Sequence, residues 1–323
     1  MIKNIHKLLE DKDFAELVKG SSISFFLRFG GLGAGYILTL VIANLFGAKG
    51  LGDYVLAITV LGIFTLFAKI GLDTTSIRFI ASFASQQKWT SIFSFRKKVV
   101  SILTLTSLIS SFLMYFLAIP ISDLINANPK YIELNAFFVL PLAFFMLHYQ
   151  SLRGLKKIAE FSFFYRVSQA LFSIISIAVI YQFIQTSEVP LYSYLVSLVI
   201  VSLLSFLSFQ YSLKKQSATK ESAVKEVMTY SDIIKISIPL MFAQSVQYVM
   251  AWTDKLILGN MATPEEVGIY FTSFKLSMFA AVGLMAINSI ASPKFAEMFG
   301  KNDLEGLKKV VHQSTKMIFW ISV

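Results

Sequence analysis

Four basic side chains lie inside long apolar runs of the sequence, where a charge is costly: Arg28, Lys69, Lys255 and Lys275. A charged side chain at the bilayer centre costs about 2.5–3.5 kcal/mol on insertion scales, so such residues normally face a water-filled cavity, pair with a partner or reach an interface. Lys69 and Asp73 are four residues apart, and this helical spacing predicts a local ion pair.

Arg28 is the strongest candidate for binding an anion. Gly31, Gly35 and Thr39 follow it at helical spacing, so one helix face combines an arginine with small and polar residues. A guanidinium also presents a planar fork of donors that suits phosphate oxygens. We favour a cavity wall that binds substrate phosphate. The alternative is that Arg28 snorkels to the membrane surface while the glycines allow close helix packing.

A second polar stripe lies along a later apolar run, residues 233–258, and consists of Gln244, Gln247, Tyr248, Asp254 and Lys255. We predict that Gln244, Gln247 and Lys255 bind substrate together with Lys275 from the next run. Lys255 could equally anchor its helix at the interface, and Lys275 could equally snorkel. Asp254 is a candidate for ion coupling, and the alternative is that it pairs with a neighbouring lysine.

Enzymatic and cofactor chemistry has little support in the sequence. There is no cysteine, and the three histidines are far apart, so no metal or thiol site is expected. The glycine run 30–35 does not match a nucleotide-binding fingerprint and follows no strand, so helix packing explains it. We therefore predict no cofactor, no metal and no catalytic residue.

The elements that carry these residues are apolar helices. The chain has 323 residues, of which 55% are hydrophobic and 15% charged, with a mean hydropathy of +0.67. This composition predicts an all-α polytopic membrane protein, because a span needs about 20 apolar residues. Eight complete spans are expected near residues 22–46, 54–77, 99–121, 132–152, 162–184, 191–213, 233–258 and 267–291. A ninth begins near Thr315, and residues 1–19 form an amphipathic helix on the membrane surface.

Basic residues predict the orientation. Most of the 29 lysines and arginines fall before span 1 or in the loops after spans 2, 4, 6 and 8. By the positive-inside rule, those segments and the N-terminus are cytoplasmic. The net charge of +10 then belongs to the inner membrane surface, so no nucleic-acid partner is expected.

An internal repeat is visible at an offset of 216 residues. Gly52-Asp53-Tyr54 aligns with Gly268-Ile269-Tyr270, and Ser76–Phe79 aligns with Ser292–Phe295. Each copy follows a long helix and a short hairpin, and both copies have the same orientation. We therefore predict two lobes related by a parallel repeat about an axis along the membrane normal.

Several short segments carry a family resemblance: FGAKGLGDY (46–54), GLDTTSIR (71–78), LRGLKK (152–157), DKLILG (254–259) and EVGIY (266–270). They resemble the polysaccharide and O-antigen flippases of the multidrug/oligosaccharidyl-lipid/polysaccharide exporter superfamily. The resemblance implies a first lobe with the N-terminal helix (1–213), a linker (214–232) and a second lobe (233–323). Family members have 12 to 14 spans, so we expect the second lobe to be incomplete and the chain to be a fragment or truncated product.

The resemblance also implies a function. The expected cargo is a polyprenyl-diphosphate-linked oligosaccharide that crosses the bacterial inner membrane, with membrane lipid and polysaccharide-assembly proteins as partners. The alternatives are a cation-coupled multidrug antiporter of the same superfamily, a membrane glycosyltransferase or polymerase, and an inactive product.

The predicted topology can be tested with single cysteines, since the chain contains none. Cysteines at positions 49 and 188 should react with an impermeant maleimide in intact cells. Cysteines at positions 97 and 220 should react only after permeabilisation. The opposite pattern at either pair would show that the span assignment is wrong.

Overall fold

The computed structural model describes residues 12–217, 228–300 and 303–322, and every regular element in these ranges is a helix. The chain divides into two compact units, Met1–Gly268 and Ile269–Val323. The predicted all-α membrane fold is confirmed. The division after Gly268 is not a test of the predicted lobes, whose boundary at residues 214–232 stays a prediction.

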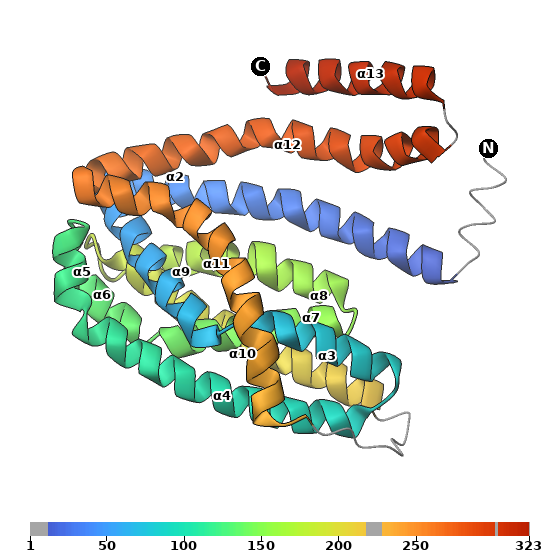
Figure 1. Ribbon diagram of the computed structural model, residues 1–323. Coiled ribbons are helices and arrows are strands. Elements are labelled where there is room, and N and C mark those ends of the chain that lie inside the picture. The colour runs from blue at the N-terminus through green and yellow to red at the C-terminus, as the bar shows by residue number, and fades with distance from the viewer. Residues whose placement is uncertain (1–11, 218–227, 301–302, 323) are drawn as a thin grey trace. The chain divides into compact units, whose positions relative to one another are not determined.

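The first long helix, α2 (Lys12–Lys69), contains two of the predicted spans. Its 58 residues would extend roughly 87 Å at 1.5 Å per residue, far more than a bilayer core of about 30 Å. Gly47 breaks the helix with a φ of 73°, which a residue without Cβ adopts readily. Figure 1 shows the change of direction there.

The second predicted span, 54–77, is too long at its C-terminal end. The helix ends at Lys69, and α3 (Leu72–Ser85) begins after Ile70 and Gly71, which have φ values of 37° and 79°. Lys69 lies directly before this break and Asp73 and Thr74 follow it closely, so the apolar run already ends here. The predicted span carried on through these polar residues to residue 77.

The remaining helices of the first unit follow in order: α4 (Trp89–Phe116), α5 (Ala118–Leu124), α6 (Pro129–Ala136), α7 (Val139–Gly154), α8 (Ile158–Phe163), a π-helix (Phe164–Ser168), α9 (Gln169–Ile180), α10 (Val189–Ser217) and α11 (Tyr230–Met261). Among the described residues, five helices are long and apolar enough to cross a membrane. A sixth span counts if α6 and α7, bent by 54°, form one. The break at Gly47 divides the first of the five, so predicted spans 1 to 7 all have helical counterparts.

The last two helices are α12 (Pro264–Gly300) and α13 (Leu304–Ser322). The start of α12 belongs to the first unit, and the rest of α12 and all of α13 form the second. α12 corresponds to the eighth predicted span. α13 begins about three turns before Thr315, where a ninth span was expected.

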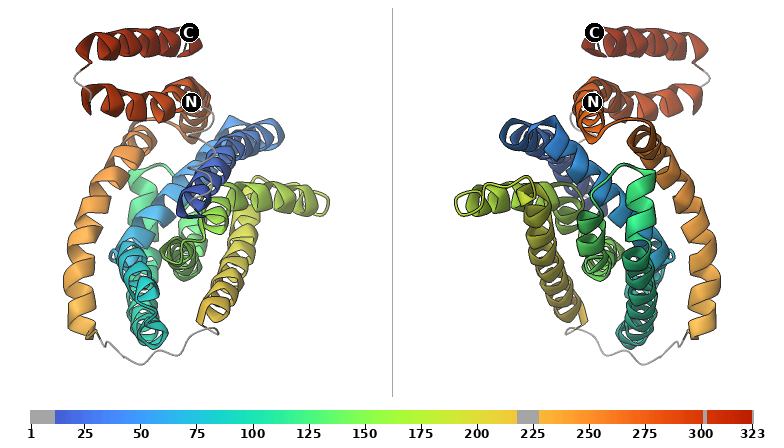
Figure 2. Two further views of the ribbon diagram at one scale, coloured as in Figure 1. Left: turned by 90° about the vertical axis from the view of Figure 1, so that its right-hand side faces the viewer. Right: turned by 90° about the vertical axis from the view of Figure 1, so that its left-hand side faces the viewer.

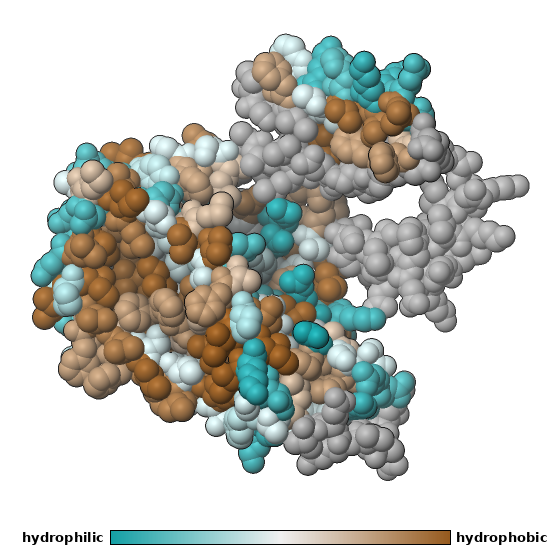
Figure 3. All heavy atoms as spheres, in the orientation of Figure 1, coloured by the Kyte–Doolittle hydropathy of each residue, from teal (hydrophilic) through white to brown (hydrophobic). Residues whose placement is uncertain are grey.

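Large apolar side chains cover the outside of the first unit. On α4, the exposed ones include Leu105, Leu108, Ile109, Phe112 and Phe116. Figure 3 shows apolar residues gathered over the left part of the face turned to the viewer, with polar residues between them and at the edges. An apolar patch of this extent is suited to lipid rather than water.

Two glycines let α12 begin against α2. A Cβ on Gly52 would collide with the carbonyl oxygen of Pro264, and a Cβ on Gly268 would collide with that of Ala48. These contacts are reciprocal, because Gly52 and Gly268, and likewise Ala48 and Pro264, are each 216 residues apart. Such an exchange of equivalent partners is what a two-fold axis between the hairpins produces. It supports the predicted offset, while superposition of the full copies stays a prediction.

Substitution of either glycine tests this contact. Gly52→Ala and Gly268→Ala should each destabilise the protein by about 1–3 kcal/mol, because the new methyl group overlaps a backbone carbonyl. Gly33→Ala is the matched control, since nothing lies within 4 Å of its Cβ position. Thermal unfolding in detergent measures all three. Equal melting temperatures would show that the hairpins are not in close contact.

Candidate functional site

A buried polar cluster joins the break at the end of α2 to α11. The Lys69 ammonium donates to Asp73 Oδ2 at 2.6 Å, to Gln244 Oε1 at 2.8 Å and to the Tyr248 hydroxyl at 3.2 Å. Lys69 and Asp73 are each only 3% exposed at the side chain. We call these four residues the Lys69 cluster. The predicted ion pair between Lys69 and Asp73 is confirmed, and its contact with α11 is additional.

The break between α2 and α3 brings α11 close enough for these contacts. Gly71 lies against the α11 backbone at Ser237 and Met241, where a Cβ would collide. Beside it, the hydroxyl groups of Thr75 and Ser237 are 2.8 Å apart. Gln244 Nε2 also donates to the Thr74 hydroxyl, so the amide bridges α3 and Lys69. Figure 2 shows α11 beside the second half of α2 and α3.

The aromatic ring of Tyr248 shields the cluster. Lys69 Nζ lies 5.0 Å from the centre of this ring, and Trp252 stacks on it with a centroid distance of 4.6 Å. Trp252 in turn packs over Gly62, where a Cβ would lie 2.7 Å from the indole. Asp73 Oδ1 is buried and has no hydrogen-bond partner among the described residues. Removing either charge of such a pair therefore leaves the other buried and uncompensated.

A second cationic feature lies where α2 meets the π-helix. A Cβ on Gly31 would lie only 2.7 Å from the carbonyl oxygen of Arg166, so the two backbones are in contact. Arg28 lies one turn before Gly31 on α2, so both arginines belong to the same helix contact. Within the described residues Arg28 makes no ion pair, and Arg166 Nε is buried without a hydrogen-bond partner. We call Arg28 and Arg166 the arginine pair.

Sequence analysis missed Arg166 because it was counted with the basic residues of the loop after span 4, although residue 166 also falls within the predicted span 162–184. The helix is wound as a π-helix over Phe164–Ser168, which shifts the register of side chains. π-helical turns are frequent at functional sites, but nothing in the local sequence announces this one.

The other predicted site residues do not form one group. Gln244 is part of the Lys69 cluster, whereas Gln247, three residues later, is exposed. Lys255 donates to the carbonyl oxygen of Ala251, and its ammonium lies 3.8 Å from Asp254 Oδ1. The structure therefore matches the alternative in which Asp254 pairs with a lysine, and its role in ion coupling stays untested. Among the described residues, no group of acidic or histidine side chains could hold a metal ion.

Lys275 belongs to the second unit, on α12. Its ammonium lies 5.3 Å from the centre of the Phe271 ring, one turn earlier on the same helix. This contact with an aromatic face partly compensates a charge in an apolar segment. The proposed role in substrate binding is not tested by it.

Neutralising one member of the buried ion pair should lower the stability of the protein, whereas neutralising both members should largely restore it. Lys69→Met should destabilise the protein by about 3–5 kcal/mol, because Asp73 keeps a buried charge with no cation. The double variant Lys69→Met/Asp73→Leu should recover most of this loss, measured by thermal unfolding in the same detergent. A double variant as unstable as the single one would contradict the ion-pair explanation.

Comparison with known proteins agrees with this architecture. The family model described as polysaccharide biosynthesis protein matches residues 17–299. A solved structure of the MATE multidrug transporter DinF-BH is similar, with a TM-score of 0.53 and 14% identity. The match covers 94% of this chain and 69% of that one. No curated protein matches the sequence. The chain is a multi-pass membrane protein with a MATE-like fold, and it belongs to the polysaccharide biosynthesis protein family of the multidrug/oligosaccharidyl-lipid/polysaccharide exporter superfamily.

Proposed function

We propose that this protein is a flippase that moves a polyprenyl-diphosphate-linked oligosaccharide across the inner membrane. Family membership and the similar fold support transport rather than covalent chemistry. The observation that carries the choice of cargo is the arginine pair. Two cations at one helix contact, with no carboxylate paired to Arg28 among the described residues, are suited to a ligand that brings more than one negative charge.

A diphosphate meets this requirement. Two like charges close together inside a membrane repel each other, and each is poorly hydrated. An anion that contacts both arginines reduces the repulsion and replaces the missing hydration. Arginine can also bind phosphate oxygens in a bidentate fashion. The lipid tail of the cargo would remain in the bilayer, and the sugars would need only a polar path between the lobes.

The reciprocal contact between Gly52 and Gly268 supports a rocking mechanism. Equivalent hairpins from the two repeats meet at one end of the helices, which allows each repeat to pivot about the shared contact. In the predicted topology these hairpins are on the outer side. A cavity closed there would receive cargo from the inner leaflet, and rocking would then expose it outside.

The multidrug antiporter alternative makes the opposite electrostatic demand. A cationic drug would be stabilised by an anionic cavity, but the buried carboxylate of Asp73 is already neutralised by Lys69. The arginine pair would repel such a cargo. The resemblance to a drug transporter extends to the fold and does not favour its cargo.

Arg28→Ala should reduce polysaccharide export about 10- to 100-fold in a strain that lacks its own flippase. The reason is the loss of charge-assisted hydrogen bonds worth about 1.5–3 kcal/mol. Arg166→Ala should have a similar effect, and Arg28→Lys should retain part of the activity because it keeps the charge but not the fork. Export is measured as surface polysaccharide at matched protein abundance.

Arg78→Ala is the matched control, since Arg78 is exposed and contacts the Phe79 ring. It removes the same side chain without touching the arginine pair, so export should stay near wild type. Equal export by wild type and Arg28→Ala would reduce Arg28 to a snorkelling residue. Loss of export in the Arg78 control would show a non-specific effect of basic residues.

A further inference from the structure

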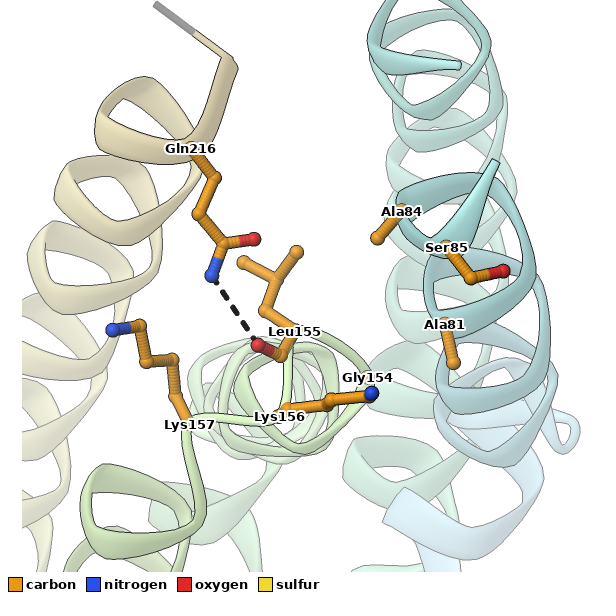
Figure 4. Close-up of a pocket in the computed structure, with 8 residues that line it drawn as sticks. All are labelled: Ala81, Ala84, Ser85, Gly154, Leu155, Lys156, Lys157 and Gln216. Atoms are coloured by element: carbon orange, nitrogen blue, oxygen red, sulfur yellow. Dashed lines mark hydrogen bonds between the residues drawn. The ribbon is translucent and has the colours of Figure 1, made fainter. Parts of the chain in front are cut away.

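A small basic pocket lies at the end of the helices where α3, α7 and α10 come together. It has a volume of about 230 Å³. Ala84 and Ser85 of α3 line one side, Gln216 of α10 the other, and Lys156 and Lys157 lie on the turn between them (Figure 4). The pocket is separate from the Lys69 cluster and the arginine pair, and none of its residues has a part in the proposed cargo site.

The turn that forms the pocket floor is held in place by several contacts. Gly154 lies against Ile80 of α3, where a Cβ would be 3.0 Å from the isoleucine Cβ. The backbone N–H of Lys157 donates to the carbonyl oxygen of Leu152 at 2.9 Å, which closes the end of α7. Gln216 Nε2 donates to the carbonyl oxygen of Leu155 at 3.3 Å and ties the turn to α10. The pocket walls are therefore fixed relative to one another.

The backbone of the turn sends the two lysines to opposite sides. Lys156 has a φ of 59°, in the left-handed region that non-glycine residues rarely adopt. As a result, the Lys156 side chain extends toward α3 and the Lys157 side chain toward α10, as Figure 4 shows. Within residues 12–217 and the other parts of the chain that the structure describes, no acidic residue lines the pocket, and Glu160 lies beyond the turn on α8. The two lysine side chains thus flank a cavity that has no carboxylate among its described lining residues.

Size and charge together define the ligand. The volume is large enough to admit a phosphate group with a short ester arm. The pocket is on the predicted cytoplasmic side, where basic pockets between membrane helices meet the phosphates of anionic lipids.

We propose that this pocket, flanked by Lys156 and Lys157, binds the phosphodiester headgroup of an anionic glycerophospholipid from the inner leaflet. The lipid would bridge α3, the turn after α7 and the end of α10. This inference rests on the predicted topology and is independent of the cargo.

Native mass spectrometry of the delipidated protein, titrated with phosphatidylglycerol or with phosphatidylcholine of the same chains, tests the proposal. Wild type should bind one phosphatidylglycerol in clear preference to phosphatidylcholine. The double variant Lys156→Gln/Lys157→Gln should bind phosphatidylglycerol about tenfold more weakly. The matched control Lys214→Gln/Lys215→Gln removes the same charge from exposed positions of α10 outside the pocket, and its affinity should change by less than about twofold.

Two further arms separate a built site from general attraction. Ala84→Phe fills the cavity and keeps both lysines, so it should also abolish the preference. If Ala84→Phe binds phosphatidylglycerol as well as wild type does, the proposal is wrong. It is also wrong if the Lys214/Lys215 control weakens binding as much as the Lys156/Lys157 variant does. Inorganic phosphate at millimolar concentration should not displace the lipid. If free phosphate competes fully, the site recognises a soluble anion and the lipid assignment is wrong.

Discussion

The close approach of Gly52 and Gly268 is the contact on which the arrangement of the helices depends. It fixes where α12 starts relative to α2, and any side chain at either position would collide with a backbone carbonyl. The symmetric exchange of the partners Ala48 and Pro264 supports the predicted repeat, in which the contact relates two copies of one motif. A transporter built from repeats needs such a shared point, since both halves must move about it without losing contact.

The Lys69 cluster serves a different physical purpose from an ordinary stabilising ion pair. The cost of desolvating two buried charges can exceed the energy of their attraction. A well-packed apolar pair at the same positions could therefore be at least as stable. An apolar pair would lack the directional hydrogen bonds that this ion pair makes. Lys69 has hydrogen bonds to Asp73 on its own side and to Gln244 and Tyr248 on α11, so only one register of α11 satisfies all of them. The cluster therefore specifies how α11 docks, in addition to any stability it provides.

The sequence revealed the local features of the fold and missed those that depend on distant partners. Apolar length located the helices, and the four-residue spacing predicted the pair of Lys69 and Asp73, because both are properties of one segment. The break at Ile70 and Gly71 was missed because the predicted span continued to residue 77, although Lys69, Gly71 and Asp73 already interrupt the apolar run there. Arg166 was missed because it was counted with the basic residues of the loop after span 4. A π-helical turn changes which side a residue faces without changing composition.

The contacts of the basic residues inside the spans also explain why the arginine pair is the better candidate for cargo. Lys69 is already paired with Asp73, and Lys255 donates to the Ala251 carbonyl oxygen beside Asp254. A ligand phosphate would have to compete with those internal partners, and each exchange would expose a buried carboxylate or carbonyl. Arg28 makes no ion pair within the described residues, so an anion that reaches it displaces no carboxylate. Binding at the arginine pair therefore removes an electrostatic cost, whereas binding at Lys69 would create one.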